Sequence, residues 1–429
     1  MQLPDVTVAS GTSFRWLNWV GHCLIKSVEL EIGGQRIDKH YGDWIHIWNE
    51  LTQTAGHQIG YATMVGNSPY LTTPSATTGV TVSGDTLYVP LEFFWNRNPG
   101  LALPLIALQY HEVKINLELN DAKNCYWSGT VSGGVPTTTM SGVTIPSLTC
   151  SLFVDYVYLD TDERRRFAQV SHEYLIEQLQ FTGDESTSNT NNKFKLNFNH
   201  PTKELIWVVQ RDLNVSDSAP WGKQWFNYTD DYDYTYTAAA GVSGGAFALS
   251  NGSTVAPDGT DRQAGAMPGV AAGGANNVYV PVSFENGVNP VSRALLQLNG
   301  HDRFSERDGK YFNLVQPYQH HENVPSCGVN VYSFALRPEE HQPSGTCNFS
   351  RIDNATLQLT LSSRTVSGGS AKVRIYAVSY NVLRIMSGMG KRNKAAHNSW
   401  LPSRLQFKPC RVNSVMNCTF HRMASVGCI

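Results

Sequence analysis

The amino-acid sequence predicts an all-β protein made of two tandem sandwich domains, and three observations support this. Short segments in which apolar and polar residues alternate recur along the chain, as expected for strands with one face in a core. Long stretches rich in Gly, Ser, Thr and Pro separate these segments, which is typical of surface loops or hairpins. A set of three strand motifs also occurs twice in the same order. Two sandwiches or jelly rolls of about 200 residues each fit these features best.

Six segments carry the strand pattern. Some alternate strictly, such as VKINLEL at residues 113–119, and others are rich in Val and Tyr, which strands favour. We predict strands at residues 28–32, 113–119, 152–159, 194–198, 357–361 and 373–383.

Helical periodicity is weak along most of the chain. The best case is residues 42–54, where Trp44, Ile47, Trp48 and Leu51 recur at steps of three and four. We predict a short helix there.

The internal repeat divides the chain. Residues 28–37 (VELEIGGQRI) and 295–304 (LLQLNGHDRF) both contain a strand, a glycine turn and a polar-Arg-apolar ending. Residues 115–119 (INLEL) are matched by residues 357–361 (LQLTL), and each half ends in a Val/Tyr-rich strand followed by basic residues. The shared order favours duplication over chance similarity. We predict a first domain over residues 1–170 and a second over residues 171–390.

The last 39 residues differ from the rest. Residues 391–429 contain seven Lys or Arg, three Cys and no Asp or Glu, whereas residues 1–390 carry 26 Lys or Arg against 35 acids. We expect this basic tail to lie outside the fold, so that its deletion leaves folding and assembly unchanged. A tail that touches DNA or a membrane is the alternative.

Composition excludes several classes of protein. The chain of 429 residues has a net charge of −2, 41 % hydrophobic and 16 % charged residues, which argues against disorder and against nucleic-acid binding through bulk charge. Its apolar runs are too short for a transmembrane helix, and residues 1–10 show no secretory signal. The scattered cysteines predict reduced thiols rather than a disulfide framework.

No motif supports catalysis or metal binding. The G-x-S-x-G pattern around Ser243 lacks the preceding strand that a nucleophile elbow needs, so a flexible loop is expected. His111 and His172 begin H-E-x-x-H patterns without the second His. The run His320-His321-Glu322 is expected in a solvated loop, because a metal site needs three or four converging groups. We therefore predict no catalytic residue, no metal and no cofactor.

The segment 228–237 (YTDDYDYTYT) is aromatic and acidic. It is either a carbohydrate- or partner-binding surface or a hairpin edge with Tyr on both faces.

Longer strings bear a specific resemblance. Residues 28–40 (VELEIGGQRIDKH) and 342–356 (QPSGTCNFSRIDNAT) are two of them, and the others lie at residues 98–113, 173–183, 198–203 and 380–390. In these strings the chain resembles the major capsid protein of nucleocytoplasmic large DNA viruses, most closely the phycodnaviruses and their mimivirus-like relatives.

The resemblance implies a double jelly roll, two eight-stranded antiparallel sandwiches side by side. It also implies a homotrimer with a pseudo-hexagonal outline, which tiles an icosahedral shell over an internal membrane. The partners would be further copies of the chain and minor capsid proteins, with no specific nucleic acid and only indirect membrane contact. The place of action would be the virion capsid, assembled in the host cytoplasm.

The resemblance carries three finer expectations. Loops at residues 128–146 and 215–289 would lie on the outer surface, where Asn214, Asn227 and Asn251 are candidate glycan acceptors in N-x-[ST] sequons. The family pattern has an N-terminal arm and an early strand before the first motif, so the first jelly roll is expected to be incomplete and to expose a sheet edge. A carbohydrate-binding β-sandwich surface protein is the alternative function.

Overall fold

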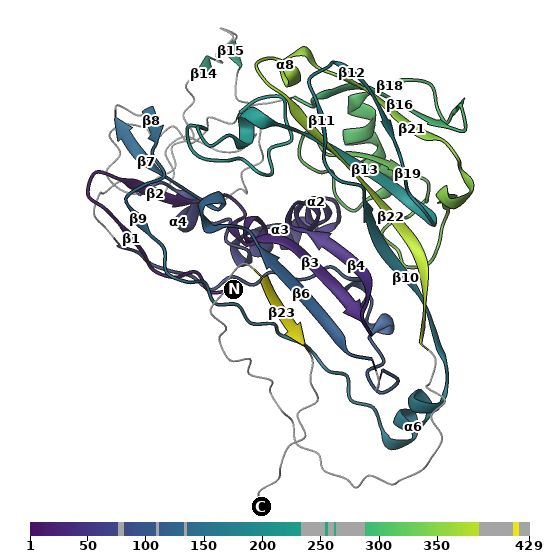
Figure 1. Cartoon of the computed structure of the whole chain (residues 1–429). Coiled ribbons are helices and arrows are strands. Elements are labelled where there is room, and N and C mark those ends of the chain that lie inside the picture. The colour runs from purple at the N-terminus through teal and green to yellow at the C-terminus, as the bar shows by residue number, and fades with distance from the viewer. Residues whose placement is uncertain are drawn as a thin grey trace, which may run out of the picture.

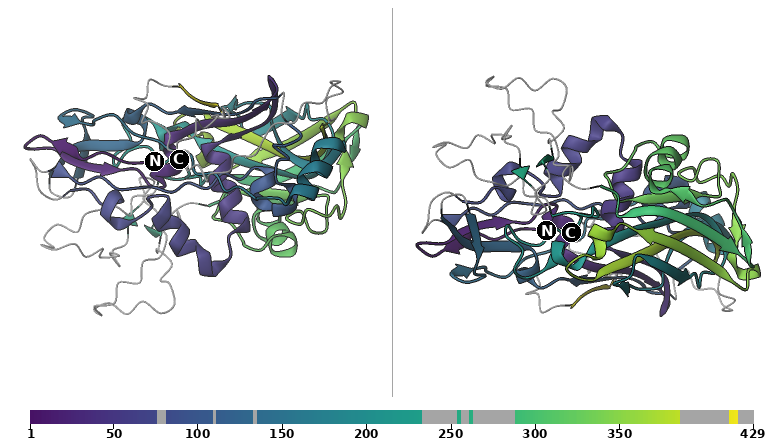
Figure 2. Two further views of the ribbon diagram at one scale, coloured as in Figure 1. Left: turned by 90° about the horizontal axis from the view of Figure 1, so that it is seen from below. Right: turned by 90° about the horizontal axis from the view of Figure 1, so that it is seen from above.

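The computed structural model describes residues 1–385 and 415–419, except 76–80, 109–110, 133–134, 233–253, 256–260 and 263–287. Antiparallel sheets dominate it, with short helices between them (Figure 1). The first half of the chain forms one end of the molecule and the second half forms the other (Figure 2). Within the described residues, no helix is long and apolar enough to cross a membrane.

The second half is a sandwich of two sheets. One sheet has the order β10-β22-β13-β19, with β11 on β22 and β20 on β13, and the other has the order β12-β21-β16-β17, with β18 on β16. Leu205, Trp207 and Val209 of β13 face Leu357 and Leu359 of β21 in the core between them. The strands are β10 (His172–Phe181), β11 (Glu185–Thr187), β12 (Asn191–Lys195), β13 (Pro201–Arg211), β16 (Val291–Leu298), β17 (His301–Asp302), β18 (Arg307–Asp308), β19 (Asn330–Ser333), β20 (Cys347–Asn348), β21 (Ala355–Leu361) and β22 (Ala371–Ile385).

The first half has three smaller sheets, with the orders β23-β6-β3-β4, β2-β7-β8 and β5-β1-β9. Its strands are β1 (Val6–Val8), β2 (Ser13–Trp16), β3 (Ile25–Ile32), β4 (Gln35–Tyr41), β5 (Thr81–Val82), β6 (Val113–Leu119), β7 (Tyr126–Ser132), β8 (Val135–Thr138) and β9 (Val143–Thr144), joined by β23 (Val415–Thr419) from the tail. A separate hairpin pairs β14 (Thr254–Val255) with β15 (Asp261–Arg262).

Short helices connect the sheets. They are α1 (Val20–Leu24), α2 (Gly42–Thr52), α3 (Ala55–Met64), α4 (Pro69–Thr72), α5 (Phe94–Arg97), α6 (Thr161–Gln169), α7 (Gln316–His320) and α8 (Ser363–Val366). The predicted helix at residues 42–54 is confirmed as α2, whereas α3 and α6 were not predicted.

The internal repeat appears as a shared pairing order. In the first half β3 lies between β6 and β4, and in the second half β16 lies between β21 and β17. Both hairpins turn on two residues with positive φ, Gly33-Gly34 (59° and 83°) and Asn299-Gly300 (51° and 81°). That conformation is typical of two-residue hairpin turns and favours Gly and Asn. The two motifs found in the sequence therefore fold into the same local unit.

Most predicted strands are confirmed, and one is wrong. Residues 28–32, 113–119, 357–361 and 373–383 lie in strands, and 194–198 only begins in one. Residues 152–159 form no strand, and Phe153 and Val157 are 82 % and 74 % exposed. A Val/Tyr-rich pattern marks residues suited to a strand but cannot supply the neighbouring strand that must pair with them.

Of the tail, the structure describes residues 415–419. Val415–Thr419 pairs antiparallel with β6, so part of residues 391–429 joins a sheet of the first half.

Candidate functional site

The interface between the two halves is built around helix α2. Trp44, Ile47, Trp48 and Leu51, the residues whose spacing predicts the helix, form an apolar cluster against the sheet of the second half. Their partners there include Ile206, Val208, Val331, Tyr376 and Val378. Because β13 already faces the sandwich core with its other side, it is buried on both faces. Helix α2 thus extends one hydrophobic core across the boundary between the halves.

The two ends of α2 are fixed by polar contacts with the second half. At its start, Asp43 lies 3.3 Å from Arg374 Nη1 and accepts a hydrogen bond of 2.5 Å from the Tyr376 hydroxyl. At its end, Glu50 Oε2 accepts hydrogen bonds from the backbone N–H and the hydroxyl of Ser326, and Glu50 Oε1 lies 3.0 Å from His46. Burial would raise the pKa of Glu50, but His46 and Ser326 together lower it, so the carboxylate is favoured.

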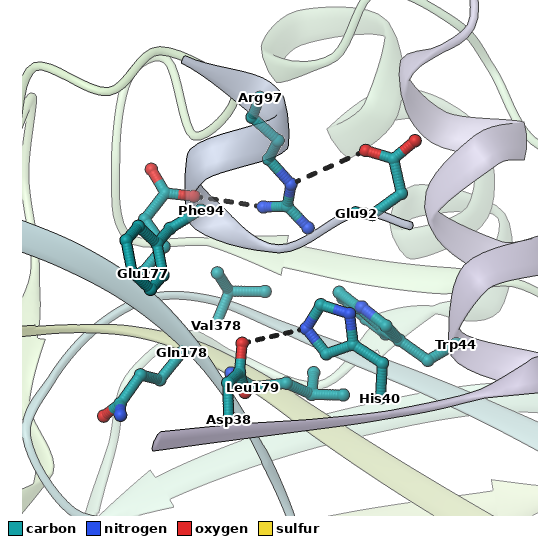
Figure 3. A pocket seen from close by; sticks show the side chains of 10 residues that line it. All are labelled: Asp38, His40, Trp44, Glu92, Phe94, Arg97, Glu177, Gln178, Leu179 and Val378. Carbon is teal, nitrogen blue, oxygen red and sulfur yellow. Dashed lines mark hydrogen bonds and ion pairs between the residues drawn. The ribbon is translucent and has the colours of Figure 1, made fainter. Parts of the chain in front are cut away.

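A chain of buried and half-buried charges continues along the interface (Figure 3). Arg97 of the first half lies 3.1 Å from Glu177 of β10, and its guanidinium stacks over Trp48 at 3.9 Å. Lys203 of β13, fully buried, reaches the other oxygen of Glu177 at 2.8 Å. The far side of Arg97 approaches Glu92 at 3.9 Å, and burial raises the pKa of Glu92 although Arg97 opposes it. One carboxylate, Glu177, therefore joins cations from both halves.

Next to Lys203, Glu204 takes part in a second cluster. His321 Nε2 lies 2.9 Å from Glu204 and His321 Nδ1 lies 2.8 Å from Glu339, and the side chains of His321 and Glu204 are fully buried. Burial lowers the pKa of His321, but the two carboxylates outweigh burial and raise this pKa to about 9. The run 320–322 was expected in a solvated loop, and for His321 this is wrong. A polar run looks solvated in a sequence, whereas here it supplies the cation that a buried carboxylate requires.

These charges do not form a ligand pocket. The cavity lined by Asp38, His40, Glu92, Arg97 and Glu177 has room for only about one water molecule. Over the part of the chain that is described, no three His, Cys, Asp or Glu side chains are grouped to hold a metal ion. The arrangement can hold two domains in one orientation, and it shows no space for a substrate.

The segment that follows β13 crosses from the second half to the first. Trp221 and Phe226 pack into the core of the first half, where Trp221 contacts Trp127, and Tyr228 joins the α2 cluster. The described part of the aromatic and acidic segment is buried, since Tyr228 and Tyr232 are 1 % and 5 % exposed. Both readings of residues 228–232, a binding surface or a hairpin edge, are therefore wrong. The remaining residues, 233–237, and Ser243 lie outside the described residues.

Two of the three candidate glycan acceptors lie in the core. Asn214 and Asn227 are fully buried, and their amide nitrogens donate hydrogen bonds to backbone carbonyls, both of them to Asp231. A glycan on either nitrogen would break these bonds and force the side chain out of the core, so the structure argues against both acceptors. Asn251 lies outside the described residues.

Comparisons with known proteins agree along nearly the whole chain. A family model described as "Large eukaryotic DNA virus major capsid protein" matches residues 163–391, and one described as "Major capsid protein N-terminus" matches residues 1–160. The major capsid protein of Phaeocystis pouchetii virus is 52 % identical, over 90 % of this chain and 84 % of that protein. That of Paramecium bursaria Chlorella virus 1 is 42 % identical, over 86 % of this chain and 78 % of that protein.

Solved structures give the same result. The crystal structure of PBCV-1 VP54, fitted into a reconstruction of the virophage Sputnik, aligns with a TM-score of 0.57 and 35 % identity, covering 92 % of this chain and 90 % of that one. The Faustovirus major capsid protein aligns with the same TM-score at 14 % identity, over 88 % of this chain and 74 % of that one, which supports the fold alone. The predicted all-β double jelly roll is confirmed.

Proposed function

This chain belongs to the major capsid proteins of large eukaryotic DNA viruses, and we propose that it acts as the trimeric, pseudo-hexagonal building block of an icosahedral shell. The observation that carries the proposal is the match to the PBCV-1 capsid protein over 92 % of this chain. The carbohydrate-binding alternative is not supported, because the matches are to capsid proteins and the described part of the aromatic segment is buried.

The interface between the halves supports this role. A trimer can fill a position with sixfold surroundings only if each chain presents two similar domains in a fixed orientation. Helix α2 and the charge chain Arg97–Glu177–Lys203 supply that fixed orientation through contacts buried in the monomer. A domain pair joined only by a linker would instead move freely.

The finer parts of the proposal follow from the family. The role is structural rather than enzymatic, the two jelly rolls divide near residues 170–171, and copies of the chain associate with one another and with minor capsid proteins. The chain has no specific nucleic-acid partner and contacts the internal membrane only indirectly. Assembly takes place in the host cytoplasm.

Light scattering coupled to size exclusion tests the trimer. One chain has a mass of 47.5 kDa, so three make about 142.5 kDa. A stable species of that mass is the expected result. A monodisperse monomer or dimer at micromolar concentration would contradict the proposal, and circular dichroism of the same fractions would establish that the chain is folded.

A further inference from the structure

The helical segment that follows the second hairpin leaves an apolar face exposed. A π-helix (Tyr311–Val315) runs directly into α7. Leu314 and Val315 precede Tyr318 by four and three residues, so the three side chains lie on one side of this segment. All three are exposed, and Tyr318 is 80 % exposed. We call these three residues the helical patch.

The opposite side of the same segment is fixed to the second half. Phe312 is fully buried in the core of the sandwich. Asn313 Nδ2 donates hydrogen bonds to the backbone carbonyls of Ser326 and Val329, at 3.1 and 2.8 Å. The helical patch is therefore displayed by a rigid element, and a rigid surface loses little freedom when a partner binds it.

The internal repeat gives this segment a counterpart. Helix α2 follows the hairpin β3–β4 of the first copy, and the helical segment follows the hairpin β16–β17 of the second copy in chain order. The apolar residues of α2 have the same spacing of three and four, but they are buried against β13 and β22. One helical face is thus covered within the chain, whereas the helical patch is exposed in a single chain.

The surface that α2 covers has a counterpart as well. Strand β22 is the Val/Tyr-rich strand that ends the second half, and residues 152–159 are the Val/Tyr-rich segment that ends the first. In that segment Leu152 packs against the core of the first half, while Phe153 and Val157 are exposed. The ring of Phe153 lies 6.5 Å from that of Tyr88, which is also exposed. We call Tyr88, Phe153 and Val157 the first-half patch.

We propose that the helical patch of one chain packs against the first-half patch of a second copy, an inference that rests on the proposed trimer. Each chain presents one patch of each kind, so the contact runs head to tail and can close into a ring of three. In this ring every junction uses the same pair of elements. A helical segment that follows a hairpin covers a Val/Tyr-rich segment, within a chain through α2 and between chains through the helical patch. Such alternation gives the trimer its pseudo-hexagonal outline.

The helical patch also continues an interface that already exists within the chain. Just beyond α7, Asn323 donates a hydrogen bond from its backbone N–H to Leu51 O at 3.1 Å, and one from its side chain to Glu50 O at 2.9 Å. These contacts join the helical segment to the end of α2. A second copy seated on the helical patch therefore extends the interface between the halves, and aromatic residues such as Tyr318 and Phe153 are typical of subunit contacts.

Cross-linking between two different variants tests the contact directly. We would co-express a Phe153→Cys chain with a Tyr318→Cys chain and treat the purified protein with a bismaleimide. Both positions are more than three-quarters exposed, so the substitutions leave the core intact. The expected result is a species with the mass of two chains on a denaturing gel, with position 153 of one chain linked to position 318 of the other by mass spectrometry.

The controls separate this link from the reactivity of the native cysteines. Either variant expressed alone, and the wild-type chain, should give at least about tenfold less of the two-chain species. The matched control replaces the Tyr318→Cys chain by Tyr70→Cys, at an exposed aromatic residue outside both patches, and it should give no link to position 153.

A second experiment perturbs each patch separately. Tyr318→Asp and Phe153→Asp should each raise the protein concentration at which half of the chains are assembled by at least about tenfold, as expected when a buried aromatic contact is lost. Tyr70→Asp should leave that concentration unchanged. Light scattering measures the assembly, and circular dichroism of the same samples establishes that each variant is folded.

The outcomes distinguish this inference from the proposed function. If the wild-type chain forms a trimer, but the 153–318 link is absent and both Asp variants assemble as the wild type does, the contact is overturned and the trimer stands. If the link forms in an assembly of another size, the contact stands and the proposed trimer is overturned. A wild-type chain that stays a folded monomer overturns both.

Discussion

The buried cluster of Glu204, His321 and Glu339 predicts a specific loss of stability at alkaline pH. The pKa of His321 is raised from about 6.5 in an unfolded chain to about 9 in the folded one, by carboxylates at 2.9 and 2.8 Å. At about 1.36 kcal/mol for each pH unit between the two values, the protonated form contributes about 3 kcal/mol to the free energy of unfolding.

The sign follows from which state binds the proton more tightly. The folded chain binds the proton of His321 more tightly than the unfolded chain does. The stabilisation by protonated His321 is therefore fully present below pH 6.5 and is lost as the pH rises through about 9. Deprotonated His321 would also leave the buried carboxylate of Glu204 without its cation.

Urea unfolding at pH 6, 7, 8, 9 and 10, followed by tryptophan fluorescence, measures this effect. The wild-type free energy of unfolding should fall by about 3 kcal/mol more over this range than that of His321→Gln, whose side chain does not titrate. The exposed His57 provides the matched control, because His57→Gln should keep the wild-type pH dependence. Identical pH slopes for wild type and His321→Gln would refute the reasoning.

Three further predictions concern the packing of the fold. Trp44→Ala should lower the free energy of unfolding by about 3–5 kcal/mol, because it leaves a cavity in the fully buried interface between the halves. The control Tyr70→Ala, at a side chain 60 % exposed, should change the free energy of unfolding by less than about 0.5 kcal/mol. Equal effects of the two substitutions in urea unfolding would contradict the role of α2. Gly33→Ala and Gly34→Ala should each cost about 1–2 kcal/mol, because φ is positive at both positions and the added Cβ meets at most the exposed side chain of His111. Thermal melts that show no loss for either variant would count against the turn geometry. Deletion of residues 391–429 should expose the β6 edge and produce larger species in light scattering. The sequence alone predicts instead that the deletion leaves folding and assembly unchanged. An unchanged mass and melting temperature would support that sequence-based expectation.

Local patterns predicted the elements that depend on their own residues. The alternation of residues 113–119 and the spacing of Trp44 and Trp48 identify β6 and α2, because one buried face is enough to set the period. Helix α6 could also have been predicted, since Asp160 and Glu163 form a capping box at its start. Residues 152–159 could not be placed, because strand formation depends on a partner elsewhere in the chain.

The interface was harder to predict because its parts are far apart in the sequence. Glu204 and His321 are separated by more than a hundred residues, and no local spacing connects them. One signal was available in the sequence. Lys203 and Glu204 directly precede the apolar run Leu205–Val209, and a strand that is buried over its length forces charges at its end to find buried partners.

The repeat explains how one chain obtained two different roles from one local unit. After the hairpin of the first copy the chain forms α2 at once, whereas after the hairpin of the second copy it passes through β18 and a π-helix (Tyr311–Val315) before α7, which ends at His320 beside the buried His321. Both helical segments come after the hairpin in chain order. Helix α2 supplies an apolar contact with β13, and His321, directly after α7, supplies the cation for Glu204 of the same strand. In both copies, therefore, the segment that follows the hairpin stabilises β13. In the first copy it does so through apolar burial, and in the second copy through a buried charge. Substitution at Trp44 should weaken β13 at any pH, whereas substitution at His321 should weaken it mainly below about pH 9, so the two contributions can be separated in a single set of unfolding curves.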